Sequence, residues 1–156
     1  MTEIEELVLE GIPFPPSNNG LYATSKQGRR FPSQAHKSYT AQWHLYALTH
    51  REGIMAASAI MKTWHALGFG FEIHCTFYSP GWVTKKHKTA KMDVQNRDKM
   101  LLDCLFGTVG IDDSEIVKCT YQKSLSQLPQ VKVIMRPCFI QSFELADAMI
   151  HNEREI

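Results

Sequence analysis

The residues best suited to chemistry are acids in one stretch of the chain, residues 91–117. Asp93 lies near the beginning of this stretch, and Asp112 and Asp113 lie near its end, shortly before an apolar pair. Carboxylate oxygens are the ligands that Mg²⁺ and Mn²⁺ prefer in proteins. The stretch therefore predicts a divalent-metal site, on condition that the fold brings its two ends together.

A helix between these acids is the element expected to position them. We expect it to begin at Asp93 and to stop at Gly107. Three polar residues recur at three- and four-residue spacing and so share one face: Asn96, Lys99 and Asp103. Another side carries residues that can enter a core: Met100, Leu101, Cys104 and Leu105. The helix start and the start of the next strand are expected to meet at one edge of a sheet.

The remaining elements follow from the pattern of apolar, proline and glycine residues. Residues 12–20 are rich in proline and asparagine, which excludes a helix or a central strand there. Ser33 is a suitable helix N-cap. Strands are expected at 5–11, 69–78, 115–122 and 130–135, a basic hairpin turn within 21–32, and helices at 34–49, 54–67 and 139–150. This order indicates one α/β or α+β domain over the 156 residues, whose last helix either caps the core or meets a partner chain.

Basic residues are concentrated in two loops, although the whole chain has a formal net charge of only +1. One group belongs to the turn within 21–32, and the other lies just before Asp93. The candidate phosphate-binding residues among them are Arg29, Arg30, Lys85, Lys86 and Lys88. Such loops are either simply solvated or hold phosphates without reading base sequence. The position of the second group beside the acids favours phosphate contact.

The chain lacks the features of a membrane or secreted protein. It contains no run of about 18 apolar residues, so no membrane span is expected. Its N-terminus has no basic-then-apolar signal pattern. The four cysteines form no C-x-x-C pair, which is typical of reduced thiols in the core of a cytoplasmic protein.

Two segments, taken together, resemble the RusA family of phage and prophage-type endonucleases. The first is I-P-F-P-P-S-N-N-G-L-Y followed by G-R-R-F, and the second is D-V-Q-N-R-D-K-M-L-L-D-C-L with I-D-D-S-E-I-V. The family pattern is P-P-S-x-N, then D-x-D-N-x-x-K-x-x-x-D-x-L, then a D-D pair leading into a strand. The likeness extends over residues 7–133 and leaves residues 139–156 as a C-terminal extension.

The resemblance implies a small mixed β-sheet packed with helices, in a protein that works as a homodimer. It implies resolution of Holliday junctions, which are four-way DNA branches, by paired nicks. The expected cofactor is Mg²⁺, with Mn²⁺ as the alternative metal, and no small-molecule cofactor is expected. Two subunits would present two sites to the two continuous strands of the junction.

Position by position, the resemblance assigns roles to residues of the second segment. Three would be catalytic: Asp93, Lys99 and Asp113. Four would hold the metal: Asp93, Asp112, Asp113 and, through its amide oxygen, Gln95. Two would support them: Asn96, which matches the family's asparagine, and Asp103, which matches the later acid.

Gln95 departs from the family pattern, which has a second acid at this position. A neutral amide in place of a carboxylate removes part of the attraction for a cation. Three outcomes stay open. The metal is held by the remaining three acids, or Asp98 supplies charge from three residues further on, or the protein binds junctions with weak or no nuclease activity.

Each residue of the predicted site also has an ordinary structural explanation. Asp93 suits a helix cap, Asp112 and Asp113 suit a turn before a strand, and Lys99 with Asp103 suits a surface ion pair. Three functions therefore need to be separated: a junction-resolving nuclease, a junction-binding protein without catalysis, and a dimeric scaffold with solvated basic loops. The complete set at the family's spacing favours the nuclease.

Overall fold

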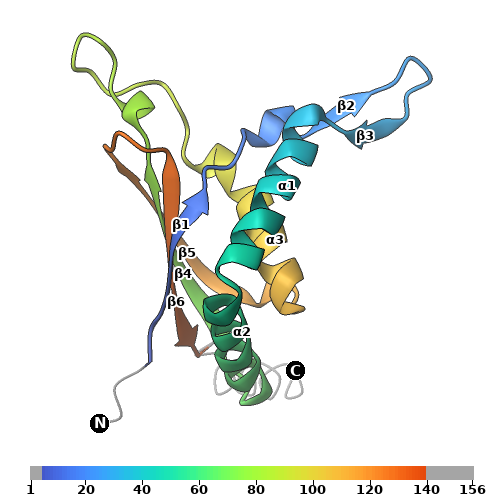
Figure 1. The fold of residues 1–156 in the computed structure, drawn as a ribbon, viewed down its shortest axis with the longest axis vertical. Coiled ribbons are helices and arrows are strands. Elements are labelled where there is room, and N and C mark those ends of the chain that lie inside the picture. The colour runs from blue at the N-terminus through green and yellow to red at the C-terminus, as the bar shows by residue number, and fades with distance from the viewer. Residues whose placement is uncertain (1–4, 140–156) are drawn as a thin grey trace, which may run out of the picture.

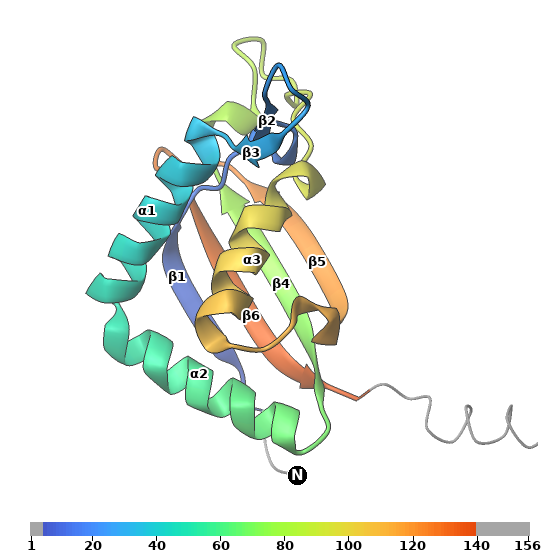
Figure 2. The ribbon, with the colours of Figure 1, turned by 90° about the vertical axis from the view of Figure 1, so that its right-hand side faces the viewer.

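The structure, a computed structural model, describes residues 5–139 of the chain. A four-stranded mixed sheet in the order β1-β6-β4-β5 forms one layer, and three helices lie on one side of it (Figures 1 and 2). The strands are β1 (Leu7–Pro13), β4 (Gly70–Tyr78), β5 (Ile116–Ser124) and β6 (Gln130–Cys138), and the helices are α1 (Gln34–Thr49), α2 (Arg51–Ala66) and α3 (Asp98–Val109). The predicted fold class is confirmed, whereas the helix expected at 139–150 lies, beyond its first position, outside the described residues.

Alternation along the strands builds the core between the sheet and the helices. Val131, Val133 and Met135 of β6 are fully buried, while the residues between them are partly exposed. α3 buries Leu101 and Leu105 in the same cluster. The polar side of α3, with Lys99 and Asp103, is thereby left outside the core, whereas Asn96, which was predicted to share that face, lies in the short 3₁₀ helix Gln95–Arg97 before α3.

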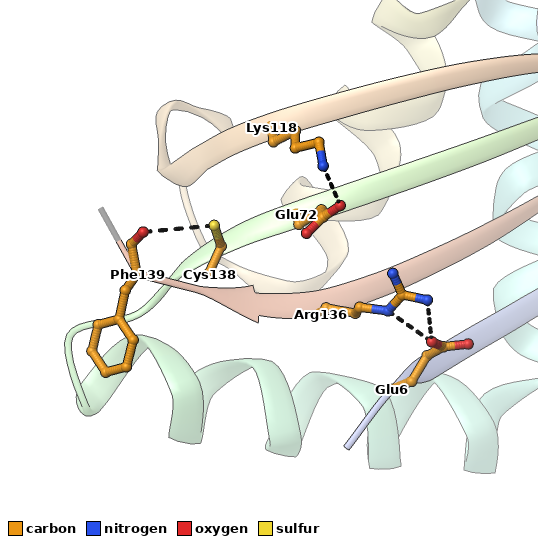
Figure 3. Close-up of polar contacts among 6 residues, drawn as sticks. All are labelled: Glu6, Glu72, Lys118, Arg136, Cys138 and Phe139. Atoms are coloured by element: carbon orange, nitrogen blue, oxygen red, sulfur yellow. Dashed lines mark hydrogen bonds and ion pairs between the residues drawn. The ribbon is translucent and has the colours of Figure 1, made fainter. Parts of the chain in front are cut away.

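The face of the sheet opposite the helices carries ion pairs between neighbouring strands (Figure 3). Lys118 Nζ lies 2.9 Å from Glu72 Oε1, and Arg136 Nη2 lies 2.6 Å from Glu6 Oε2. Because these side chains are partly exposed, each pair contributes about 0–1 kcal/mol to stability. They support strand register and do not form part of the candidate site.

Helices α1 and α2 are separated at His50 and not at Gly53. Ser33 caps α1 as predicted, with its hydroxyl oxygen accepting from the His36 N–H at 3.2 Å. The prediction that the second helix begins at residue 54 was wrong, because the helical backbone already begins at Arg51 and continues through Gly53. Within the described range, no helix combines the length and the apolar character needed to cross a membrane.

Both predicted ends of α3 were wrong. Asp93 lies in the preceding loop, and a short 3₁₀ helix, Gln95–Arg97, separates it from the true start at Asp98. Gly107 stays helical, whereas Gly110 adopts a φ of 79° and closes the helix. A left-handed backbone costs glycine no steric strain, which makes Gly110 the stop signal.

One end of the sheet carries both basic loops. β4 is parallel to β5 and antiparallel to β6, and β6 is antiparallel to β1, so β1, β4 and β5 all finish at this end. The predicted hairpin, β2 (Tyr22–Thr24) with β3 (Arg30–Pro32), projects from it. A second loop, closed by the bridge between Val83 and Thr89, follows β4 and projects at the same end of the molecule, well apart from the hairpin in the view of Figure 1. We call these two loops, residues 25–29 and 83–89, with their flanking residues, the basic end.

Candidate active site

The N-terminal loop at residues 14–20 is fastened to the segment that leads into α3. Asn96 Nδ2 donates to Ser17 Oγ at 2.8 Å, and Arg97 Nη1 donates to the carbonyl oxygen of Pro15 at 3.0 Å. Ser17 and Asn96 are separated by 79 positions in the chain. The two motifs that carry the family resemblance are therefore in direct contact.

Asn18 makes three side-chain hydrogen bonds at the place where the N-terminal loop meets the segment leading into α3. Its Nδ2 donates to Asp98 Oδ1 at 3.0 Å and to the carbonyl oxygen of Gln95 at 3.4 Å. Its Oδ1 accepts from the backbone N–H of Lys99 at 3.2 Å. One amide side chain thus holds three positions at the start of α3.

Asp98 faces the protein rather than an open metal site. Its Oδ1 accepts from Asn18, and its Oδ2 accepts from the Tyr121 hydroxyl at 2.6 Å. Burial, together with the hydrogen bond to Asp98, raises the pKa of Tyr121, so this hydroxyl remains a donor at ordinary pH. Both oxygens of Asp98 already have protein partners, which argues against Asp98 as a substitute for the acid that Gln95 replaces.

Lys99 places a positive charge on the exposed side of α3. Its Nζ lies 3.1 Å from Asp103 Oδ2, one turn further along the helix. The hydrogen bond and the charge of Asp103 raise the pKa of Lys99 above its ordinary value, and the charges of Tyr22 and Asp113 act in the same direction. Lys99 therefore stays protonated well above neutral pH and is attracted by the negative charge of Asp113.

The three candidate metal-binding acids are exposed and form local turns. Asp93 Oδ1 accepts from the Gln95 N–H at 3.0 Å, and Asp112 Oδ1 accepts from the Ser114 N–H at 2.8 Å. The interaction with Ser114 lowers the pKa of Asp112. Asp113 begins the 3₁₀ helix Asp113–Glu115, which leads into β5. Asp93 caps a turn before α3 and not α3 itself.

Strand direction sets Asp93 apart from Asp112 and Asp113 within the single chain. Because β4 and β5 are parallel, the pair lies where β4 begins, while the loop that carries Asp93 follows the end of β4. The 12 residues of α3 span about 18 Å between these two places. Among residues 5–139, no three His, Cys, Asp or Glu side chains are close enough to share a metal ion.

The chemistry of these donors nevertheless suits a hard divalent cation. Asp93, Asp112 and Asp113 offer charged oxygens at the surface, and exposed Gln95 offers a neutral amide oxygen. Such oxygen-only donors select Mg²⁺ or Mn²⁺ over metals that prefer sulfur or imidazole. The donor types fit the implied metal, but in one free chain these donors are not close enough together to show which of them bind the same ion.

The basic end is positively charged. Its candidate DNA-binding side chains are all exposed: Arg29, Arg30, Lys85, Lys86 and Lys88. Neither residues 11–51 nor residues 73–92 contain an aspartate or glutamate. The fold therefore gathers a positive field at the end where the loop carrying Asp93 begins, which suits a polyanion such as DNA.

Sequence reasoning does not identify Asn18 or Tyr121 as parts of this site. Asn18 lies in the P-P-S-N-N segment, but at the position that the family pattern P-P-S-x-N leaves unspecified, so the pattern gave no signal for it. Tyr121 gave no signal either, because its contact with Asp98 depends on how β5 packs against α3. Both residues hold the segment around Lys99 rather than line the exposed surface.

Comparison with known proteins identifies the family of the chain. Residues 13–136, most of the 156-residue chain, match the family model described as Endodeoxyribonuclease RusA. A search of curated proteins found no significant match. The chain therefore belongs to the RusA family of endodeoxyribonucleases, the enzymes that resolve Holliday junctions.

Proposed function

We propose that this nuclease resolves four-way DNA junctions by paired nicks that require Mg²⁺, with Mn²⁺ as the alternative metal. It would do so as a homodimer in the cytoplasm, during DNA recombination or repair. The observation that supports the proposal most is the contact between the two family motifs. Through that contact the segment of Asn96 and Lys99 is held beside the N-terminal loop, next to the basic end.

The basic end would bind the DNA backbone. Arg29 and Arg30 on the β2–β3 hairpin and the three lysines of the second loop are exposed and free of neighbouring acids in sequence. Contacts of this kind hold phosphates and fix orientation without selecting a base sequence. Selection of a junction over a linear duplex would then come from the shape of the branch.

The acids would supply the metal site. When bound, a divalent cation activates a water molecule and polarises the scissile phosphate. The ligands would be Asp93, with Gln95 as a weaker ligand, at one end of α3 and Asp112 with Asp113 at the other, and all three acids would share one cation only where a second chain of the dimer brings the two groups together. Because these groups are not gathered within the described part of the free chain, we expect weak metal binding by the protein alone and tighter binding when junction DNA is present.

Lys99 would stabilise negative charge on the phosphate as the bond breaks. Its raised pKa keeps it cationic, and a fixed cation at the point where charge develops lowers the barrier. Asp103 would keep Lys99 charged and extended along the helix. Asn96 would brace the segment through Ser17 rather than bind the metal.

A homodimer suits the symmetry of the substrate. A junction is resolved by two nicks at symmetric positions, and one chain offers one set of candidate catalytic residues. A two-fold pair of chains presents two identical sets. The proposal therefore predicts that nicking of both strands requires the dimer.

A second candidate function is junction binding with weak or no cleavage. Gln95 is the observation that favours it, since a neutral amide stands at a position where the family has an acid. The basic end would remain intact in such a protein. The two candidates agree about DNA binding and differ in catalysis.

One assay separates these functions. The wild-type protein is incubated with a labelled synthetic four-way junction, with and without Mg²⁺ or Mn²⁺. Symmetric nicks that disappear in Asp113→Asn, but persist in the control Glu52→Gln on α2, support the resolvase. A shifted but uncut junction in either metal supports the binding protein, and the absence of a shift at low salt leaves a scaffold.

A further inference from the structure

Helix α3 lacks an N-cap from its own sequence. Arg97 occupies the capping position and makes no side-chain capping bond. The first N–H groups of a helix have no partner inside it and need an acceptor. The Lys99 N–H, the second within the helix, finds that acceptor in Asn18 Oδ1, from a residue 81 positions earlier. Asn18 is thus the N-cap of α3, supplied by a distant loop.

The amide of Asn18 has the two functions that this place requires. Its oxygen accepts from Lys99, and its nitrogen donates to the Asp98 carboxylate at 3.0 Å. An aspartate would accept but not donate, and it would bring a second negative charge against Asp98. An alanine would leave the Lys99 N–H and one Asp98 oxygen without this partner.

Asp98 and Tyr121 complete the attachment from the other side. The Tyr121 hydroxyl, on β5, donates to Asp98 Oδ2 at 2.6 Å. Asp98 is the first residue of α3, where a negative charge is stabilised by the helix dipole. The chain from the N-terminal loop through Asp98 to β5 therefore fixes the start of α3 between two separate elements.

We infer that Asn18, Asp98 and Tyr121 are positioning residues for cleavage, acting through Lys99 and the segment 93–97. This inference rests on the proposed function. None of the three is a catalytic residue, because their polar atoms are engaged with one another and with the helix backbone. Loss of the attachment would leave the basic end able to bind DNA while Lys99 and Asp93 lose their fixed orientation.

The first test compares Asn18→Ala with the control Glu52→Gln. Asn18→Ala removes the attachment, whereas Glu52→Gln changes an exposed residue of α2 whose side chain makes no hydrogen bond or ion pair in the described part of the chain. We expect Asn18→Ala to lower kcat for junction cleavage by roughly ten- to a hundred-fold while KM stays near the wild-type value. Tyr121→Phe, which removes one hydroxyl, should shift kcat in the same direction, and Glu52→Gln should shift neither constant.

The second test does not depend on activity. Hydrogen exchange of residues 95–99 should accelerate in Asn18→Ala and in Tyr121→Phe but not in Glu52→Gln, with thermal unfolding confirming that each variant is folded. Unchanged exchange in both variants, or wild-type kcat in both, would overturn the inference. If the wild type itself cuts no junction, the proposed function fails and the exchange result alone decides the positioning role. Should Asn18→Ala fail to fold, Tyr121→Phe decides both measurements.

Discussion

Gly70 lies beneath the start of β5, where a side chain has no room. A Cβ at Gly70 would lie 2.9 Å from the Glu115 carbonyl oxygen and would collide with Val117 Cγ2. Favourable contacts between carbon atoms need about 3.5–4.0 Å. One of the two obstacles is backbone, which cannot rotate away as a flexible side chain can.

The substitution Gly70→Ala therefore forces β5 away from β4 at the point where Asp113 precedes the strand. Overpacking of this kind costs about 1–3 kcal/mol. For a chain of this size a loss of 1 kcal/mol lowers Tm by about 2–4 °C, so the expected decrease is about 2–12 °C. Because the displaced residues adjoin Asp112 and Asp113, cleavage should fall even at temperatures where the variant is folded.

The matched control is Gly107→Ala. Gly107 is exposed within α3, and apart from its chain neighbours and the backbone of its own helix nothing lies within 4 Å of the position that an alanine methyl group would occupy there. Alanine in place of a helical glycine should stabilise the protein by about 0.5–1 kcal/mol. Both variants are measured by calorimetry and by junction cleavage. A Tm for Gly70→Ala equal to or above that of the wild type would show that the start of β5 is not packed as described.

Three further predictions concern the chemistry. Asp103→Asn should lower the pKa of Lys99, so that activity in a pH–rate profile declines at a lower alkaline pH than in the wild type. In the wild type, the stability contributed by the Lys99–Asp103 pair is fully present below the ordinary lysine pKa. It is lost as pH rises through the raised pKa of Lys99. Replacing Lys85, Lys86 and Lys88 together by alanine should make junction binding less sensitive to salt. The slope of log K against log salt concentration, measured by titration at several salt concentrations, should become less steep by about 0.9 for each phosphate that the variant no longer neutralises. A chelator should stop cleavage while leaving the gel shift in place, and cleavage that survives exhaustive chelation would contradict the metal requirement.

Local signals in the sequence predicted the parts of the fold that depend on local interactions. Ser33 was recognised as a cap because its partner, the His36 N–H, is three residues away. The β2–β3 hairpin followed from its glycine-containing turn, where Gly28 has a φ of 78°. In both places the residues that determine the structure are close together in the chain.

Non-local contacts explain the errors at α3. The cap of this helix is Asn18, so no pattern around Asp93 marks its true start. Likewise, the expected meeting of Asp93 with Asp112 at one sheet edge assumes a strand arrangement that the sequence does not specify. The parallel pairing of β4 with β5 determines the separation of Asp93 from Asp112. Parallel strands are not joined by a tight hairpin turn, so no turn motif in the sequence indicates this pairing.

The near-neutral total of +1 conceals an uneven distribution of charge along the molecule. The lysines and arginines of the basic loops extend from one end, while toward the other, where β5 begins, Lys118 and Arg136 are paired with acids and Asp112 and Asp113 are exposed. Such a separation gives the molecule a permanent electric dipole moment, which rotates it during diffusion so that its cationic loops meet a nucleic acid before its carboxylates do. At ordinary salt this torque acts only within about one Debye length, roughly 8–10 Å, so productive collisions should become rarer as ionic strength rises.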